Sequence, residues 1–373
     1  MYINIPVKVG KEEKFLEIWD KEEKLFEFRI PCACNAQGFC ADYFASVPLK
    51  DTDLKNLWFK GDFCNEFFEG ITYTKEPASN STKRPRFHFT PEYGWINDPN
   101  GLVYDGEKYH LYYQYNPFNL QWANMLWGHA ASSDLINWQH QDAVMFPDEN
   151  GMMFSGCGLK NENALLGYDK NALLFFYTSA GDSTPWSKDV PFAQRLAVST
   201  DGGATLNKLK APVISGLGKD SRDPMVFWHE NSRAYVMVLY LENNDFGILR
   251  SEDLMDWKLT QRFTLKDAWE CPNLLSFDVA GRTVWLLLTA DGFYYFGEFD
   301  GFCFSTDGKK HLAYANDVPY AAQAYSGVKD RAVLIPWLRL KRSIDNNVYP
   351  VRKSSDQITM IIYYNIIEVT QEA

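Results

Sequence analysis

The chain has 373 residues, a formal net charge of -11 and an aromatic content of 16%. It is long enough to bury a full core in one large domain with an appendage. The negative charge argues against a nucleic-acid partner, because a phosphate backbone is bound by clustered Lys and Arg that this chain does not supply. No apolar run approaches the length of a membrane span, so the sequence predicts no membrane partner.

The first residues, Met1 to Lys8, have neither the basic n-region nor the continuous apolar stretch of a signal peptide. The seven cysteines are scattered and odd in number, which is typical of free thiols in a reducing compartment. Cys32, Cys34 and Cys40 resemble part of a zinc site, but no second pair follows at ligand spacing. We therefore predict a cytoplasmic protein without a metal or another cofactor.

The N-terminal part of the chain predicts a small β-domain over residues 1–76. Apolar and polar residues alternate in Lys14–Trp19 and again in Leu25–Ile30, as in strands with one buried face. The polar stretch that follows, residues 77–84, is rich in Ser, Thr and Lys and predicts a linker.

Internal repetition predicts the architecture of residues 85–345. Ser132–Trp138 recurs as Ser251–Trp257, and Ser199–Gly202 recurs as Ser305–Gly308. The aspartates of these corners, at positions 134, 201, 253 and 307, lie 67, 52 and 54 residues apart, which suits one four-stranded propeller blade per repeat. Short runs rich in aromatic and β-branched residues lie between the corners, at Lys108–Gln114, Ala172–Tyr177, Ala234–Leu239 and Thr283–Leu288. We therefore predict an all-β chain with a five-bladed β-propeller.

Three carboxylate motifs stand about one blade apart. Each places an acid against Pro or Gly, which fix the backbone where a side chain must hold one direction: Asn97-Asp98-Pro99-Asn100-Gly101, Arg222-Asp223-Pro224 and Glu270-Cys271-Pro272. Any one of them alone also reads as a turn acid that binds its own backbone. Ser155 and Gln323 continue the blade spacing, so each of the five blades is expected to direct one residue at the central channel.

These motifs and their neighbours resemble glycoside hydrolase family 32, the invertases, levanases and inulinases. Seven segments occur in the order that the family shows: His88–Leu102, Tyr112–Pro117, Trp127–Ala130, Phe154–Gly156, Arg222–Pro224, Glu270–Pro272 and Phe299–Gly301. The resemblance covers residues 84–340 closely. It covers residues 1–80 loosely, where Tyr2–Lys8 resembles a small β-domain that precedes the catalytic unit in some bacterial members.

The resemblance also implies a β-sandwich of well over a hundred residues after the propeller. Only about 30 residues follow Leu340. The sandwich is therefore expected to be missing, and residues 346–373 are expected to form a short tail, with one closing strand at most in Ile358–Ile367.

The resemblance implies three catalytic carboxylates. Asp98 would be the nucleophile, Glu270 the acid and base, and Asp223 the residue that binds sugar hydroxyls more tightly in the transition state. We expect amides of Asn97 and Asn100, together with Arg222, to hold Asp98 ionised. We expect an apolar setting between Trp269 and Cys271 to raise the pKa of Glu270.

The resemblance further implies a set of residues that bind the sugar. Gln114 and Ser155 would contact hydroxyl groups, Arg222 would position Asp223, and Trp122 and Trp337 would offer flat apolar faces. Core packing between blades is the alternative for both tryptophans. The full predicted set is Asn97, Gln114, Trp122, Phe154, Ser155, Arg222 and Trp337.

The function that follows is a retaining hydrolase that releases terminal β-D-fructofuranosyl residues from sucrose or fructo-oligosaccharides through a covalent fructosyl-enzyme. One alternative is a five-bladed glycosidase of the arabinanase or xylosidase type. Another is an inactive protein that binds fructosides. The sequence leaves open hydrolysis against fructosyl transfer, sucrose against sucrose phosphate or a polymer, and the oligomeric state.

Overall fold

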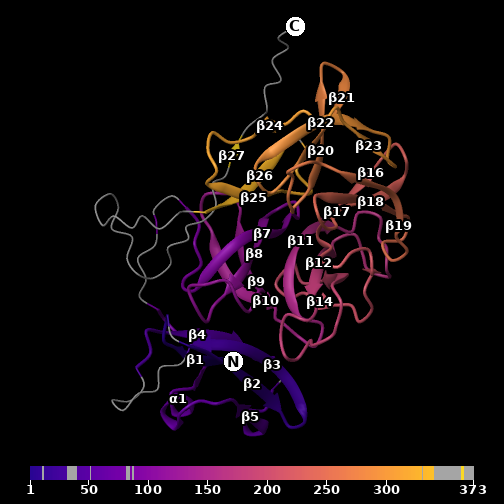
Figure 1. Cartoon of the computed structure of the whole chain (residues 1–373). Coiled ribbons are helices and arrows are strands. Elements are labelled where there is room, and N and C mark those ends of the chain that lie inside the picture. The colour runs from indigo at the N-terminus through magenta and orange to yellow at the C-terminus, as the bar shows by residue number, and fades with distance from the viewer. Residues whose placement is uncertain are drawn as a thin grey trace.

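The computed structural model describes residues 1–10, 12–31, 40–50, 52–80, 85, 88–329, 331–339 and 363–364. Regular structure in this part is almost entirely β, with one five-residue helix, which confirms the predicted class. Figure 1 shows a small β-unit, in indigo, at one end of a larger ring of sheets. No helix in the described residues is long and apolar enough to cross a bilayer.

The small domain consists of two three-stranded sheets with strand orders β4-β1-β6 and β3-β2-β5. The predicted alternation is present in β2, where Leu16 and Ile18 are fully buried. The elements of the domain are β1 (Tyr2–Val7), β2 (Glu13–Asp20), β3 (Glu23–Pro31), β4 (Tyr43–Pro48), η1 (Leu54–Asn56), β5 (Leu57–Lys60), α1 (Asn65–Glu69) and β6 (Thr72–Thr74).

The segment predicted as a linker is attached to the small domain in its described part. The side-chain amide of Asn80 pairs with both the backbone N–H and the carbonyl of Phe44, at 3.1 and 2.9 Å. The backbone N–H of Ala78 donates to Ser46 Oγ at 2.8 Å. Residues 78 and 80 therefore extend the contacts of β4 rather than spanning open solvent.

The larger unit is a propeller of five sheets, and the innermost strand of each blade comes first in the chain. Each blade is an antiparallel meander, because strands that follow one another in the chain pair side by side. The first three blades are β7 (Trp95–Tyr104), β8 (Tyr109–Asn116), β9 (Leu126–Ser132) and β10 (Gln139–Met145); β11 (Met152–Lys160), β12 (Leu173–Ala180), β13 (Ala193–Ser199), β14 (Asn207–Lys208) and β15 (Ile214–Ser215); and β16 (Arg222–His229), β17 (Ala234–Tyr240), β18 (Asp245–Ser251) and β19 (Lys258–Thr264).

The last two blades close the ring. They are β20 (Asn273–Val279), β21 (Arg282–Leu288), β22 (Phe293–Phe299), β23 (Phe304–Ser305) and β24 (His311–Leu312); and β25 (Pro319–Ala324), β26 (Val333–Leu338) and β27 (Tyr363–Tyr364). Ser326, just after β25, forms a parallel bridge with Val103 of β7, and the Tyr104 N–H donates to the Ser326 carbonyl at 2.9 Å. The inner strands of the first and fifth blades are therefore joined directly.

β27 lies in the segment predicted as a tail, at the place where one closing strand was expected within Ile358–Ile367. Tyr363 and Tyr364 pair with Leu334 and Val333 of β26. The physical reason is that β26 would otherwise leave the outer edge of the fifth blade unpaired.

The repeated corners follow the third strand of a blade. Asp134 and Asp253 each accept two backbone N–H groups from the turn that follows β9 and β18. In the fourth blade this position belongs to Asp300, which accepts from Phe302 and Cys303 N–H groups, and not to the predicted Asp307. The sequence analysis selected Asp307 because Ser305–Gly308 repeats the sequence of Ser199–Gly202. The Asp-Gly pair at 300–301 can form the same kind of turn.

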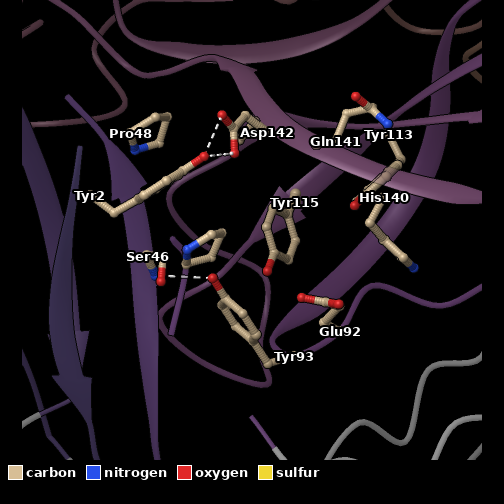
Figure 2. A pocket seen from close by; sticks show the side chains of 13 residues that line it. Tyr2, Ser46, Pro48, Glu92, Tyr93, Tyr113, Tyr115, His140, Gln141 and Asp142 are labelled. Atoms are coloured by element: carbon tan, nitrogen blue, oxygen red, sulfur yellow. Dashed lines mark hydrogen bonds between the residues drawn. The ribbon is translucent and has the colours of Figure 1, made fainter. Parts of the chain in front are cut away.

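The two domains meet along a seam between β1, β4 and β10. Tyr2 donates its hydroxyl to the Asp142 carboxylate at 2.9 to 3.0 Å, and the Ser46 N–H donates to the Tyr93 hydroxyl at 2.9 Å. Figure 2 shows these pairs around a cavity of about 70 Å³ that Tyr113, Tyr115 and His140 also line. These side-chain hydrogen bonds therefore attach the small domain to the first blade.

The expectation that all cysteines are free thiols is wrong at one position. Cys64, the residue before α1, is disulfide-bonded. Cys40, Cys157, Cys271 and Cys303 are free. The predicted zinc alternative concerns Cys32 and Cys34, which lie outside the described residues.

Candidate active site

Asp98 lies near the start of β7, with its carboxylate between the first and second blades. Ser155 Oγ donates to Asp98 Oδ2 at 2.8 Å, and Asn97 Nδ2 donates to Oδ1 at 3.2 Å. Burial, followed by the nearby charge of Glu270, raises the pKa of Asp98 to about 6, while the two hydrogen bonds oppose this rise. The nucleophile candidate is therefore a carboxyl group that loses its proton close to neutral pH.

This environment corrects the predicted one in two respects. Arg222 pairs with Glu270 rather than with Asp98. Asn100 is fully buried, and its side-chain amide faces Gln114 and Ser155. Neither residue therefore lowers the pKa of Asp98 in the way that the sequence suggested.

Asp223 begins the third blade and is almost completely buried. Its Oδ2 accepts a hydrogen bond from the Cys271 N–H at 3.2 Å and lies 3.5 Å from Cys271 Sγ. Cys271 Sγ is also 3.8 Å from Asp98 Oδ2, so one thiol contacts two of the three predicted carboxylates. Burial raises the pKa of Asp223, and the positive charge of Arg222 opposes the rise.

Glu270 lies just before β20, and its side chain is 29% exposed. Arg222 Nη2 is 2.7 Å from Glu270 Oε1, and the Tyr320 hydroxyl donates to Oε2 at 3.2 Å. The predicted apolar setting is wrong, because Trp269 is half exposed to solvent and the carboxylate faces a cation and a hydroxyl group. Both oxygens of the acid candidate are thus held in fixed directions.

Arg222 connects two of the acids. Its guanidinium lies 4.6 Å from the ring centre of Tyr240, which supports it by a cation–π contact. From there Nη2 reaches Glu270, and Nε lies 3.8 Å from Asp223 Oδ2. The predicted positioning of Asp223 by Arg222 is thus a long contact, and the short ion pair is the one with Glu270.

The backbone at these acids is unusual. Asp223, Glu270 and Cys271 adopt φ values of 61°, 43° and 44°. These are left-handed conformations that residues other than Gly rarely adopt, and such conformations cluster at functional sites. The Pro that follows each acid motif fixes the next φ angle and so helps to hold the turn.

One group of side chains has the donor atoms for a metal ion. Oxygens of Asp223 and Glu270 and the sulfur of Cys271 lie within 4.8 Å of one another. The Arg222 guanidinium already supplies a positive charge to the two carboxylates at this place. A metal is therefore not needed to balance their charge.

The predicted sugar-binding residues fall into two groups. Asn97, Phe154, Ser155 and Arg222 surround the acids, and Trp122 is 49% exposed with its ring centre 5.9 Å from that of Phe154. Trp337 packs at 6.2 Å against Tyr320 and is largely buried. Gln114 is only 2% exposed and donates to the Met153 carbonyl at 2.8 Å, which places it beneath the acids as a link between the first two blades.

The channel below the acids is nearly filled. Gln323 of β25 accepts from the Leu102 N–H at 3.1 Å and donates to the Gly156 carbonyl at 2.9 Å. A cavity lined by Ser155, Asp223, Cys271 and Gln323 among others has a volume of about 10 Å³, near the minimum for one water. This cavity is therefore too small to hold a sugar.

Sequence reasoning missed two groups that contact the acids, the Tyr320 hydroxyl and the Cys271 thiol, and also Tyr240, which contacts Arg222. Tyr320 lies on the inner strand of the fifth blade, for which the blade spacing selected Gln323 three residues later. Tyr240 ends β17, opposite Arg222 in the strand register. Only that pairing register, which the sequence does not give, identifies Tyr240 as the support of Arg222.

We expect Asp98→Asn to stabilise the folded protein at pH 7. The pKa of Asp98 is raised on folding, so the native state holds this proton between about pH 4 and 6 while the unfolded state does not, and the contribution of Asp98 to stability falls as pH rises through that range. The neutral amide avoids this loss, which amounts to about 3 kcal/mol at pH 7. The melting temperature should rise at pH 7 and match the parent at pH 4.

Asp134→Asn is the matched control, because its backbone hydrogen bonds lower the pKa of Asp134. That variant should be less stable than the parent at pH 7. A melting temperature of Asp98→Asn at or below that of the parent at pH 7 would contradict the environment described for Asp98.

Comparison with known proteins agrees with this geometry. The family model described as glycosyl hydrolases family 32 N-terminal domain matches residues 88–362, which is more than half of the chain. The chain belongs to glycosyl hydrolase family 32. The recognised resemblance is thereby confirmed, and so is the five-bladed architecture of the family 32 catalytic unit.

Several characterised family 32 proteins are similar to this chain. A levanase of Bacillus subtilis is 35% identical over 68% of the chain and 40% of its own length, and an extracellular exo-inulinase of Aspergillus niger is 34% identical over 68% and 57%. A fructofuranosidase of Schwanniomyces occidentalis, solved in complex with fructosylnystose, superposes with a TM-score of 0.63 at 32% identity, over 68% of this chain and 54% of that one. The chain thus spans about half the length of these relatives.

Proposed function

We propose that this family 32 chain is a retaining β-fructofuranosidase that releases terminal fructose from sucrose or short fructo-oligosaccharides. The observation that carries the proposal is the convergence of Asp98, Asp223 and Glu270, from three different blades, around one thiol and one guanidinium. The relatives support it, because a levanase, an exo-inulinase and a fructofuranosidase with a bound fructoside share the fold.

In the first step Asp98, in its ionised form, attacks the anomeric carbon of the terminal fructosyl unit. Glu270 protonates the oxygen of the leaving sugar, which departs as an alcohol. A covalent fructosyl-enzyme results. Ser155 and Asn97, which bind the two oxygens of Asp98, hold the attacking carboxylate in position.

In the second step a water molecule attacks the same carbon, and Glu270 accepts the proton of that water. Asp98 leaves, and the fructose is released with its configuration retained. Asp223 stabilises the positively charged centre in both steps by binding sugar hydroxyls, because its carboxylate lies deep in the site. Interception of the intermediate by a sugar hydroxyl would give fructosyl transfer instead.

We expect kcat/KM to fall as pH decreases through about 6. The reaction requires Asp98 in its ionised form, and burial raises the pKa of this carboxyl to about 6. Initial rates on sucrose between pH 4 and 8 would check this. Ser155→Ala removes a hydrogen bond that lowers the pKa of Asp98, so its acid limb should move to higher pH; an unmoved limb would be inconsistent with Asp98 as its origin.

Product analysis tests the function itself. The purified chain and its Asp98→Asn variant are incubated with sucrose, kestose, inulin and levan, with arabinan and xylo-oligosaccharides beside them. Free fructose from the parent alone supports the proposal, and the ranking of substrates identifies the preferred one. Arabinose or xylose release would support the other type of five-bladed glycosidase, and binding without turnover would support an inactive fructoside-binding protein.

A cytoplasmic location remains a prediction. The disulfide at Cys64 argues against it, since disulfides persist mainly in oxidising compartments. Growth of a host that exports no other fructosidase, with activity assayed separately in cells and medium, would decide between the two.

A further inference from the structure

The loop between β8 and β9, residues 117–125, is seated on the small domain. The ring of Phe118 is fully buried in the core of that domain, with its centre 4.4 Å from that of Phe28. The Tyr43 hydroxyl donates to the Pro117 carbonyl at 2.9 Å. The side chain of Asn119 also donates to Glu13. The first half of a propeller loop is therefore part of the packing of another domain.

Asn124 anchors the second half of the same loop. Its side-chain amide accepts from the Arg29 N–H at 2.7 Å and donates to the Arg29 carbonyl at 2.8 Å, as a neighbouring strand would. Arg29 lies on β3, an edge strand of its sheet. Asn124 is 6% exposed and left-handed, with φ of 49°, a conformation that Asn tolerates better than most residues. The small domain thus holds the loop at both ends.

Trp122 lies between these two anchors and contacts Phe154 of β11, the strand that carries Ser155. About half of Trp122 is exposed, and its ring lies edge-to-face against that of Phe154, with the ring centres 5.9 Å apart. Phe154 directly precedes Ser155, whose hydroxyl binds Asp98. The exposed ring of Trp122, two residues from the anchored Asn124, therefore contacts the residue that adjoins Ser155 in β11.

A second loop of this region is held in a similar way. Glu27 of β3 is nearly fully buried, pairs with Lys24 at 2.8 Å and accepts the Trp186 N–H at 3.0 Å. The loop that contains Trp186 continues to Phe192, whose ring packs edge-on against Phe154 at 5.7 Å. Strand β3 therefore contacts both loops that meet at Phe154.

We propose that the small β-domain positions a substrate-binding residue of the active site. It fixes Trp122, so that the exposed indole packs on the apolar face of a substrate sugar, and it thereby sets the affinity for the fructoside. A loop without these anchors would have to be ordered by the substrate, at the expense of binding energy. The inference rests on the proposed function, because it concerns how the same site binds its fructoside.

Asn124→Gly tests the anchor. Glycine keeps the left-handed backbone but removes both bonds to Arg29. KM for sucrose and kestose should rise about tenfold, corresponding to about 1.4 kcal/mol, with kcat within about twofold of the parent. Trp122→Ala should give the same rise in KM. The double variant should show no further change, because both substitutions remove one function.

Tyr2→Phe is the control, since it removes a hydrogen bond of the same domain seam on the side of Asp142. Its KM should equal that of the parent. Tyr43→Phe, which loses only the bond to Pro117, should raise KM about twofold to threefold and serves if Asn124→Gly does not fold.

The outcomes separate the two proposals. If the parent releases no fructose, the proposed function fails. If the parent is active and a folded Asn124→Gly or Tyr43→Phe variant keeps the parent KM, the inference about the domain fails. Additive effects of Asn124→Gly and Trp122→Ala would also overturn it, because they would show that the anchor acts elsewhere.

Discussion

Asp98→Asn is expected to reduce kcat on sucrose by about four orders of magnitude or more, since the amide cannot form the fructosyl ester. The amide keeps the size of the carboxylate and can still accept the hydrogen bond from Ser155 Oγ, so substrate binding should survive. Fructose release in steady state and binding of sucrose by calorimetry would measure the two effects separately. Asp300→Asn, an exposed corner residue, is the matched control and should have parental activity.

A second substitution at position 98, to a residue without a side chain, tests the stereochemistry of the reaction. Asp98→Gly leaves room for azide, which would attack from the side that the nucleophile vacated. An activated fructosyl donor should then give a fructosyl azide of inverted configuration. Azide product of retained configuration, or parental turnover in Asp98→Asn, would be inconsistent with Asp98 as the nucleophile.

Glu270→Gln should lower kcat/KM on sucrose by about three orders of magnitude. Glutamine can still accept from Arg222 through its one oxygen, and its NH2 group can donate to the Tyr320 hydroxyl, but it has no proton to give to the leaving sugar. A 4-nitrophenyl fructoside, whose leaving group needs no proton, should lose much less in its first step. Rates on both substrates, measured in parent and variant, would show this difference.

The second step gives an independent check on Glu270. Azide needs no general base, so it should intercept the fructosyl-enzyme of Glu270→Gln and form a fructosyl azide of retained configuration. Glu298→Gln on the exposed side of β22 serves as the control. Equal losses of kcat/KM on sucrose and on the activated substrate would show that Glu270 is not the acid.

The positions of the acids follow from local sequence, and their environments do not. Turn residues and blade-length spacing identify Asp98, Asp223 and Glu270, because a propeller repeats the same local structure five times. The partner of Arg222 depends on the register between β16 and β17 and on the direction that Tyr240 imposes, neither of which is local. The motifs therefore do not predict the protonation states of the acids.

Long-range pairing also explains the other differences. Gln114 carries the polar amide expected of a sugar ligand. In the structure this amide donates to the buried Met153 carbonyl of β11, the first strand of the next blade. The seating of the 117–125 loop on β3 joins segments about a hundred residues apart in the chain. Alternation and turns predict strands, whereas such contacts depend on how whole sheets meet.

Because the backbone at Asp223, Glu270 and Cys271 is left-handed, the positions of the two acids depend on the packing of the blades around them. Each of these residues gives up about 1 to 2 kcal/mol relative to an ordinary conformation. Packing between neighbouring blades must maintain these conformations. If a blade loosens, the backbone can relax and the acid moves away from the other two. Loosening of the contacts between the third and fourth blades would then abolish catalysis before the individual sheets melt.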